Sequence, residues 1–300
     1  MEVVISPGKY IVAVSGGVDS MVLLDLLVKQ AESQKDSGFK LSAHSLQLVV
    51  AHFNHGIRSD SDLDERLVTK AAHRYGLPFE VGYGKLGPKT GEDQARRARY
   101  SYLEDVKRKH KADGIITAHH QDDLIETALI NILRGTGRQG LSSIRSKKII
   151  RPLLNVPKKE ILNYAQSHSI EWREDKTNTD LSYLRNYIRH KIMPGLSTKK
   201  KADVIRNLDK VAKINEIIDQ EIATLSHNNA ELDRQSFIML PNEVGNELLV
   251  YWLRQNNLRD FDRKTVARVS TIIKTASAGS KHDILKGQVL TLTKTSALLS

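Results

Sequence analysis

The sequence predicts an α/β protein, in which a twisted parallel sheet carries helices on both faces and a smaller, mainly helical domain follows. Three observations support this fold class. Apolar runs typical of buried strands alternate with helical stretches through the first part of the chain. A glycine-rich turn joins the first run to the first helix, and helical periodicity replaces the alternation near residue 200. We therefore expect domains at residues 1–200 and 201–300.

The expected strands are short, apolar and rich in β-branched residues, as strands buried on both faces of a parallel sheet are. They are Ile11–Val14, Leu46–Ala51, Phe79–Gly82 and Gly114–Ala118. The helices expected after them are Met21–Glu32, Ser61–Tyr75, Gln94–His110 and Leu124–Leu133. In the second domain we expect helices Ile205–Leu225, Asn246–Gln255 and Arg263–Lys274, then a short hairpin in Gly287–Leu299. Ligands of such sheets bind at the carboxyl ends of the strands, so the polar residues there form the candidate site.

The turn after the first strand has the character of a pyrophosphate site. Its residues are Ser15, Gly16, Gly17, Val18, Asp19 and Ser20. Adjacent glycines let the backbone turn sharply, and the amides at a helix N-terminus attract anions. A Walker lysine and a Gly-x-Gly-x-x-Gly pattern are both absent, which leaves hydroxyls and amides for phosphate oxygens and Asp19 for Mg²⁺. An ordinary strand-to-helix turn is the alternative.

A second polar cluster, "TAHHQDDLIET", follows the fourth strand. We expect its helix to start near Asp122 or Asp123, which places Asp123 and Glu126 on one helical face close to the N-terminus. This carboxylate pair suits an ammonium group, Mg²⁺ or proton transfer from an amine, and a helix-capping pattern is the alternative. Two adjacent histidines without a cysteine are a weak zinc signature.

Two further segments supply imidazole, amide and guanidinium groups. "HFNHGIRSD" contributes His52 and Asn54 after the second strand, with a capped polar loop as the alternative. "GEDQARRARYSYL" places Arg96 and Arg99 on one helix face beside Tyr100. Taken alone, that pattern favours a solvated basic face.

The charge distribution indicates a polyanionic partner. The chain carries 46 Lys+Arg against 35 Asp+Glu, a formal net charge of +11. The segment from Arg134 to Lys159 holds eight basic residues and no acidic one, and the segment from Arg185 to Lys201 holds six more without an acid. Within the latter, Arg185 and Arg189 lie one helical turn apart, a spacing that suits phosphates or an RNA backbone.

The composition, with 40% hydrophobic and 27% charged residues, is ordinary for a soluble globular protein. The sequence shows no apolar run of membrane-spanning length and no secretion signal, so we expect a cytoplasmic protein with no membrane partner. The chain has no cysteine, which excludes a disulfide framework, a cysteine zinc site, and persulfide or iron–sulfur chemistry carried by its own side chains.

Together these motifs resemble the tRNA(Ile)-lysidine synthetase family of the N-type ATP pyrophosphatase, or PP-loop, superfamily. "SGGVDS" marks the superfamily, while "HFNHGIR", "ARRARY", "TAHHQDDLIETALINILRGTG", "RPLLNVPKKEI" and "EDKTNTDLSYLRNYIRHKIMP" follow in the family's order. The resemblance covers Ile11 to about Pro194, and the helical tail is similar to the family's first C-terminal domain. Longer members carry a further C-terminal domain, so we expect a short form that lacks it.

The resemblance implies a ligase that uses ATP and Mg²⁺. In the implied reaction, the 2-carbonyl oxygen of the cytidine at the first anticodon position of tRNA(Ile) with a CAU anticodon attacks the α-phosphate of ATP, and pyrophosphate leaves. The ε-amine of free L-lysine then attacks the 2-carbon and displaces AMP, giving lysidine. This changes decoding from AUG to AUA and the identity of the tRNA from methionine to isoleucine. Dimers are common among such enzymes, so a homodimer is a possible assembly.

The same resemblance assigns the site residues. Lysine recognition falls to Asp123 and Glu126, and these two form the catalytic set with Asp19, Arg96 and Arg185, the two arginines holding phosphate charge during adenylation. Asp19 holds Mg²⁺. The residues implied in ATP binding are Ser15, Gly16, Gly17, Val18, Asp19, Ser20, His52 and Asn54. The residues implied in tRNA binding are Arg134, Arg138 and Arg189.

Three alternatives share some of these features. A tRNA 2-thiolase of the same superfamily activates a base in the same way but delivers sulfur, generally through cysteines, and this chain has none. An amidotransferase-type synthetase brings a glutaminase and does not need the basic segments. An inactive paralogue that only binds tRNA has no use for Asp19, Asp123 and Glu126 facing a polyanion. The ligase interpretation is therefore favoured.

Overall fold

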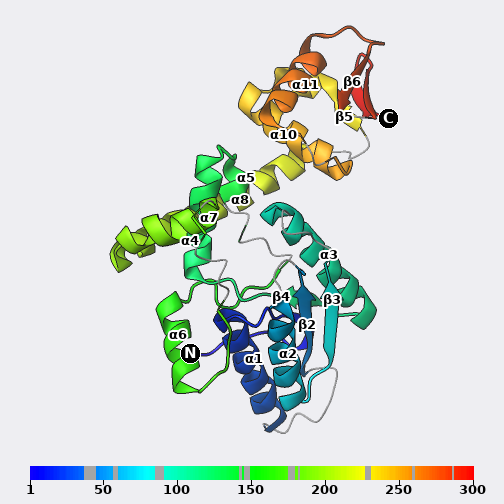
Figure 1. Cartoon of the computed structure of the whole chain (residues 1–300). Helices are drawn as coiled ribbons and strands as arrows, with labels where there is room; N and C mark the ends of the chain where they lie inside the picture. The colour runs from blue at the N-terminus through cyan, green and yellow to red at the C-terminus, as the bar shows by residue number, and fades with distance from the viewer. Residues whose placement is uncertain are drawn as a thin grey trace. The chain divides into compact units, whose positions relative to one another are not determined.

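The computed structural model describes residues 1–36, 45–56, 60–84, 91–141, 144, 149–174, 180–181, 183–226, 231–258, 261–285 and 287–300. It divides into two compact units, Met1–Val211 and Ala212–Ser300 (Figure 1). The division falls inside helix α8 (Thr198–Leu225), and the boundary expected near residue 200 lies in the first turn of this helix. The helix starts there because Ser197 accepts a hydrogen bond from the Lys200 backbone N–H through its hydroxyl, at 3.3 Å.

The first unit is built on a four-stranded parallel sheet, which confirms the predicted fold class. The strand order is β3-β2-β1-β4, so the chain moves outward from β1 to β3 and then returns to the other side of β1. The carboxyl ends of β1 and β4 therefore flank the point where the strand order reverses, which is where such sheets bind ligands. The strands are β1 (Gly8–Ala13), β2 (Leu46–Asn54), β3 (Phe79–Tyr83) and β4 (Gly114–Ile116).

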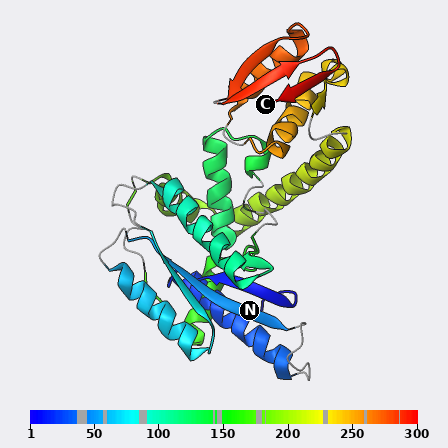
Figure 2. The ribbon, with the colours of Figure 1, turned by 90° about the vertical axis from the view of Figure 1, so that its right-hand side faces the viewer.

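Helices cover both faces of this sheet, as Figures 1 and 2 show. On one face α1 (Val18–Asp36), α2 (Ser61–Arg74) and α6 (Lys158–Ser167) pack in the main apolar core, which includes Leu23, Val68 and Ile161. On the other face α3 (Glu92–His110) packs Leu103 and Val106 against Ile11 and Val49 of the sheet. Because α1, α2 and α3 each connect two parallel strands, their N-termini or the turns before them lie at the carboxyl edge of the sheet.

The remaining elements of the first unit follow β4 and pack around helix α4. They are α4 (Gln121–Leu133), α5 (Arg138–Leu141), α7 (Leu184–Tyr187), a π-helix (Ile188–Ile192), a 3-10 turn (Met193–Gly195) and the start of α8. Ile125 and Ile130 of α4 pack with Ile188 and Met193, so the α7 and π-helical segment lies along α4.

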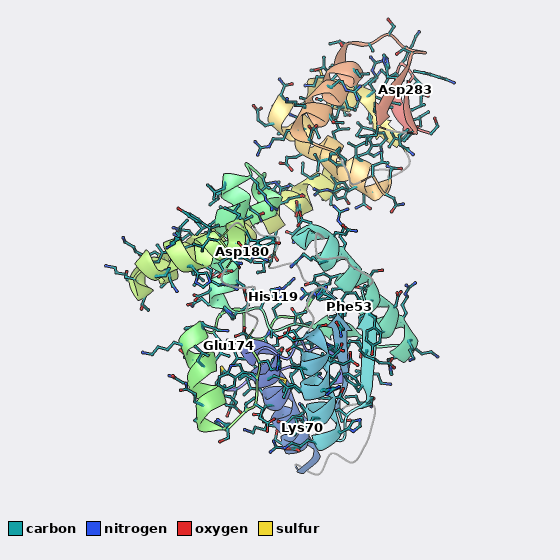
Figure 3. All side chains as sticks on the ribbon, viewed as in Figure 1. Phe53, Lys70, His119, Glu174, Asp180 and Asp283 are labelled. Atoms are coloured by element: carbon teal, nitrogen blue, oxygen red, sulfur yellow. The ribbon has the colours of Figure 1, made fainter. Side chains whose placement is uncertain are left out.

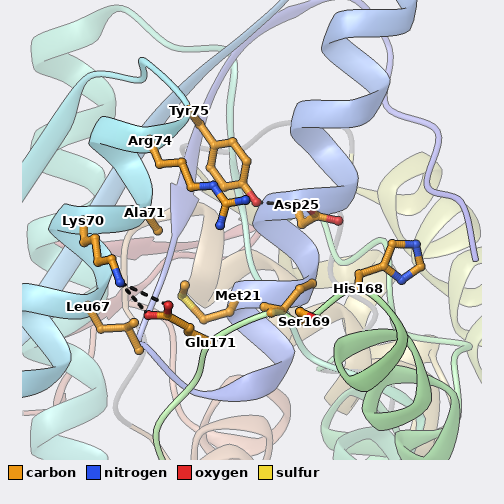
Figure 4. Close-up of a pocket in the computed structure, with 11 residues that line it drawn as sticks. Met21, Asp25, Leu67, Lys70, Ala71, Arg74, Tyr75, His168, Ser169 and Glu171 are labelled. Carbon is orange, nitrogen blue, oxygen red and sulfur yellow. Dashed lines mark hydrogen bonds and ion pairs between the residues drawn. The ribbon is translucent and has the colours of Figure 1, made fainter.

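A buried polar cluster ties α1 to α2 and α6 beside a cavity of about 70 Å³ (Figure 4). The Asp25 carboxylate accepts hydrogen bonds from the hydroxyls of Tyr75 at 2.9 Å and Tyr164 at 2.8 Å, and it lies 3.0 Å from the Lys29 ammonium. A surface ion pair between Lys70 and Glu171, at 2.9 Å, lies at the rim. Because Asp25 has partners on both oxygens, we assign this cluster to helix packing.

The second unit combines helices with an antiparallel sheet in the order β5-β8-β7-β6. The expected C-terminal hairpin is present as β7 and β8. Helices α10 and α11 begin and end within four residues of the expected positions, whereas α8 begins at Thr198 rather than Ile205 and α9 was not expected. Trp252 and Phe237 are fully buried at its core. Its elements after α8 are β5 (Glu231–Asp233), α9 (Arg234–Met239), α10 (Asn242–Gln255), α11 (Arg263–Thr275), β6 (Lys281–Leu285), β7 (Gln288–Leu292) and β8 (Ser296–Leu299).

Candidate active site at the carboxyl edge of the sheet

The turn between β1 and α1 has a backbone that requires glycine and a set of internal hydroxyl contacts. Gly16 has φ +88°, and a Cβ there would lie 3.3 Å from the Asp64 Cβ. The Ser20 hydroxyl donates to the Gly17 carbonyl at 2.9 Å and accepts from the Ser15 N–H at 3.1 Å. The turn is thus held in one conformation, with α1 starting at Val18 directly after the glycines. A helix N-terminus presented in this way is suited to binding an anion.

Asp19 lies in the first turn of α1 and contacts two groups from other elements. The Lys158 ammonium, from the first turn of α6, lies 2.5 Å from its Oδ1 atom, and the His120 Nε2 atom lies 3.7 Å from its Oδ2 atom. The Asp19 side chain is 28% exposed, so it remains accessible to a ligand. The Lys158 ammonium is therefore held next to the turn before α1, a position at which a Walker loop would carry a lysine within its own sequence.

The N-terminus of α4 is capped by its own polar cluster. The helix begins at Gln121, one or two residues before the expected start, because the His120 Nδ1 atom accepts from the Asp122 N–H at 3.2 Å. In return the Asp123 carboxylate accepts from the His120 N–H at 2.9 Å. The capping alternative is therefore present in the structure. The same capping arrangement places the Asp123 Oδ2 atom 3.4 Å from the His120 Nε2 atom, which is also the ring atom that lies near Asp19.

Glu126 lies one turn further along α4, with only 1% of its side chain exposed. Arg189 donates two parallel hydrogen bonds to it, from Nε and Nη2, each at 2.8 Å, and also lies 3.4 Å from Asp123. Arg185 lies 3.9 Å from the Glu126 carboxylate and donates to the Thr127 hydroxyl at 3.4 Å. Burial raises the pKa of Glu126, and the Arg189 guanidinium opposes this shift.

Two arginines of α3, Arg96 and Arg99, lie over the ring of Tyr100. The Arg96 Cζ atom is 4.9 Å from the ring centroid. Burial lowers the pKa of His119 to about 3, with Asp123 acting to raise it and the nearby arginines to lower it further. His119 is thus a neutral imidazole at physiological pH, and its Nδ1 atom lies 2.8 Å from the Thr117 hydroxyl.

His52 and Asn54, expected to bind ATP, lie at the end of β2 and have partners within the protein. The His52 Nδ1 atom lies 2.8 Å from the Val14 carbonyl oxygen, directly before the turn that starts at Ser15. Burial lowers the pKa of His52. Asn54 donates to the carboxylate of Glu65 at 3.2 Å and accepts from the N–H of Gly56, which is the capped loop considered as the alternative.

Arg134 and Arg138, expected to bind tRNA, lie at the other end of α4 from the carboxylates. Arg134 is the exposed C-terminal cap of α4, and Arg138 begins α5. Arg134 is eight positions after Glu126, or about 12 Å further along the helix axis. The structure therefore brings Asp19, Asp123, Glu126, Arg185 and Arg189 together but leaves these two arginines apart from them.

Three residues join the site that sequence reasoning did not assign to it. Lys158 contacts Asp19, and His120 lies between Asp19 and Asp123. The backbone N–H of Arg173 donates to the Gly16 carbonyl at 3.0 Å, and its guanidinium donates to Asp64 at 2.8 Å. The histidine pair was visible in "TAHHQDD", and Lys158 lies in the motif "RPLLNVPKKEI", but no local signal identified Arg173.

The carboxylates of this site fit Mg²⁺ only when the phosphates of a nucleotide supply the other ligands. Within the described part of the chain, no group of three or more His, Cys, Asp or Glu residues is arranged to hold a metal ion. Mg²⁺ in nucleotide sites is usually bound by one or two carboxylates together with the phosphates of the substrate, so a preformed cage is not required. Asp19, beside the glycine turn, is the carboxylate placed for that role.

Comparisons with known proteins identify the family to which the chain is similar. Residues 4–196 match the model of the PP-loop domain family. The chain is 32% identical to the tRNA(Ile)-lysidine synthase of Chlorobaculum tepidum over 90% of its own length and 79% of that protein. It is 40% identical to the tRNA(Ile)-lysidine synthase of Geobacter sulfurreducens over 63% of its own length, and there it spans only 41% of the relative's length.

A solved structure shows the same fold at lower sequence identity. The U34-tRNA thiolase NcsA from Methanococcus maripaludis, determined with its [4Fe-4S] cluster, aligns with a TM-score of 0.56 and 20% identity over 70% of this chain and 74% of that one. At this identity the likeness concerns the fold alone. Among the residues described, no helix is long and apolar enough to cross a membrane.

Proposed function

This chain belongs to the tRNA(Ile)-lysidine synthase family of PP-loop proteins, and on that premise we propose that it ligates free lysine to a CAU-anticodon tRNA(Ile). The cytidine at the first anticodon position receives the lysine at its 2-carbon. One observation carries the proposal: the glycine turn before α1 and the Asp123 and Glu126 pair lie side by side, with His120 within 3.7 Å of Asp19 and 3.4 Å of Asp123. An enzyme that joins a nucleotide phosphate to a base and then admits an amine needs both.

The first step makes the base an electrophile. The 2-carbonyl oxygen of the cytidine attacks the α-phosphate of ATP, an oxygen–phosphorus bond forms, and the bond to pyrophosphate breaks. The amides after Gly17 and the Lys158 ammonium are placed to stabilise the charge on pyrophosphate. Mg²⁺, held by Asp19 and the phosphates, would neutralise further charge on the leaving group. Arg96 and Arg185 are the further cations proposed for this step.

The second step uses the carboxylates. Asp123 and Glu126 bind the ammonium of free lysine, taking over from the Arg189 guanidinium that occupies them here. With a reference pKa of about 10.4, the lysine ammonium must lose a proton before it attacks. Glu126 is the better base of the pair, because burial raises its pKa. The amine attacks the 2-carbon, a carbon–nitrogen bond forms and AMP leaves.

The proposal is tested by following the two steps separately. Purified protein is incubated with a CAU-anticodon tRNA(Ile) transcript, ATP, Mg²⁺ and labelled lysine, and both RNA-dependent pyrophosphate release and lysine retained on the RNA are measured. Asp19→Asn should lose both signals, whereas Glu126→Gln should keep pyrophosphate release and lose lysine retention. Asp122→Asn is the matched control, because this carboxylate on the same helix pairs with Lys201 at 3.0 Å. Tight RNA binding by the wild-type protein with neither signal would overturn the proposal.

A further inference from the structure

The helical segment from Tyr183 to Ile192 has one side packed in the first unit and one side exposed. Its packed side carries Ile188, with no exposed surface, and Asn186, with 9% exposed. Arg185 and Arg189 follow the same side and reach the Glu126 carboxylate. At about 3.6 residues per turn, the remaining positions share the opposite side. We call this side the tyrosine face, and it consists of Tyr183, Leu184, Tyr187, His190 and Lys191, all exposed.

The two tyrosines of this face are not used by the fold. Each is 48% exposed, and Leu184 between them is 39% exposed. The Tyr187 N–H donates to the Tyr183 carbonyl at 2.9 Å, so the two side chains lie one helical turn apart. Neither side chain has a hydrogen bond or a ring contact with another of the described residues. The solvent side of a helix normally carries charged and polar residues, so a pair of rings there indicates a partner.

The backbone that carries the tyrosines is held firmly in place. The Asn186 side chain donates to the carbonyl of Asp180, the residue labelled in Figure 3, at 2.9 Å. One turn further on, Ile188 packs with Ile125 and Ile130 of α4. The rings are therefore presented from a fixed helix, and a partner that binds them does not have to order the segment first.

The charge around the tyrosine face favours a nucleic acid over a protein partner. From Arg185 to Lys201 the chain holds six basic residues and no acidic one. Three of the lysines, Lys191, Lys199 and Lys200, are exposed. Exposed aromatic rings beside exposed cations are the combination that binds single-stranded nucleic acid, with bases on the rings and phosphates on the cations.

We propose that Tyr183 and Tyr187 stack against unpaired bases of the RNA loop that carries the modified nucleotide. The inference rests on the proposed function for the identity of the RNA, and on the tyrosine face for the stacking. The packed side of the same helix reaches Glu126, so a loop that reacts beside Glu126 passes along this segment. A base that leaves its stack to react deprives its neighbours of a stacking partner, and the tyrosine rings replace that partner.

The test measures binding of the CAU-anticodon tRNA(Ile) transcript by matched variants. Tyr183→Leu and Tyr187→Leu should each weaken RNA binding by about fivefold to a hundredfold, the effect of losing one stacked base. Tyr183→Phe and Tyr187→Phe keep the ring and should bind within about twofold of the wild-type protein. The slope of log affinity against log salt should be unchanged in all four variants, because no phosphate contact is removed.

Two controls accompany these variants. Tyr83→Leu removes a ring that is 63% exposed at the end of β3, and it should change RNA binding little. Thermal unfolding of Tyr183→Leu and Tyr187→Leu should lie within about 2 °C of the wild-type protein, because both rings are half exposed. A loss of RNA affinity is then a loss of contact and not of folding.

A second arm removes bases from the RNA. Anticodon stem-loops with one abasic nucleotide, at each unpaired position except the modified one, are titrated against the wild-type protein and Tyr187→Leu. At the position whose base stacks on Tyr187, the abasic loop should bind the wild-type protein about as weakly as Tyr187→Leu binds the intact loop. Combining the two changes there should add little further loss. An undiminished effect of Tyr187→Leu at every abasic position would overturn the inference.

The other outcomes separate stacking from its alternatives. Equal losses in the Phe and Leu variants would assign the contact to the hydroxyls and overturn the stacking. A wild-type dimer that Tyr187→Leu converts to monomers in light scattering, with RNA affinity unchanged, would assign the tyrosine face to a second copy of the chain. Unchanged RNA affinity in both Leu variants would also overturn the inference, and the proposed function stands if the wild-type protein incorporates lysine. Losses confined to the Leu variants, in a protein that never incorporates lysine, would support the stacking and contradict the ligase.

Discussion

Replacing Arg189 by methionine leaves the buried Glu126 carboxylate without its guanidinium partner. Two hydrogen bonds of 2.8 Å are lost from a side chain that is 1% exposed, while Arg189 itself is 32% exposed. Breaking a buried ion pair from one side costs about 3–5 kcal/mol, and the partial exposure of Arg189 places this case near 3 kcal/mol. In a unit of about 200 residues that corresponds to a fall in Tm of about 6–12 °C.

The pH dependence of the free energy of unfolding provides a second check on the stability loss expected for Arg189→Met. Burial raises the pKa of Glu126 above its ordinary value, so the folded state holds this proton more tightly than the unfolded state does. The penalty is therefore absent at pH values below the ordinary pKa and grows as the pH rises through the folded-state pKa. Arg189→Met removes the opposing cation, so its deficit in Tm should shrink as the pH falls towards about 4. Adding Glu126→Gln should recover most of the stability.

The assay is thermal unfolding of the wild-type protein, both single variants and the double variant across this pH range. Arg206→Met is the matched control, because Arg206 is 66% exposed and pairs with Asp203 at 3.0 Å on the surface. Such a pair contributes about 0–1 kcal/mol. The reasoning is refuted if Arg189→Met lowers the Tm no more than Arg206→Met does, or if its deficit grows as the pH falls.

Three further predictions concern the same edge of the sheet. Gly16→Ala should lose RNA-dependent pyrophosphate release and about 1–3 kcal/mol of stability in urea unfolding. The reason is that Gly16 has φ +88° and that an added Cβ would lie 3.3 Å from its neighbour. Gly76→Ala is the control and should keep activity, because Gly76 has φ +62° but no atom near the added Cβ. Lys158→Met should raise KM for ATP about tenfold to a hundredfold in steady-state kinetics, and the exposed neighbour Lys159→Met should leave it within about twofold. The pKa of His119 is lowered to about 3, so the unfolded state binds a proton at this residue more readily than the folded state does. This lowers the free energy of unfolding as the pH falls below about 6.5, by about 2 kcal/mol at pH 5. His119→Gln should therefore flatten the pH dependence of unfolding between about pH 6.5 and pH 5.

The sequence predicted the first unit well because its elements carry local signals. Buried apolar runs identified all four parallel strands, and glycines or capping residues marked the starts of the following helices. Helix α6 was missed, because Lys158–Ser167 is only ten residues long and its apolar residues Ile161, Tyr164 and Ala165 are buried by packing in the main core. Strands β5 and β6 were also missed, because they are short and are stabilised by pairing with β8 and β7 rather than by their own composition.

The site was predictable where its residues are neighbours in sequence and less so where they come from distant segments. The Ser15–Ser20 turn and the Asp123 and Glu126 pair each lie within one short motif. Lys158 contacts Asp19 across 139 residues, and periodicity gives no information on such a contact. Arg189 was expected to bind RNA from its charge, but the packing of the π-helix along α4 turns its guanidinium to Glu126. Which cation pairs with which carboxylate is decided by that packing.

The most direct test of the central claim is the mass of the nucleoside at the first anticodon position after reaction. The wild-type protein, a CAU-anticodon tRNA(Ile) transcript, ATP, Mg²⁺ and lysine are incubated together, and the digested RNA is analysed by mass spectrometry. The account predicts a cytidine that has gained one lysine and lost one water, at that position and only when ATP is present. A cytidine in which sulfur has replaced oxygen, or an unchanged cytidine despite pyrophosphate release, would contradict it.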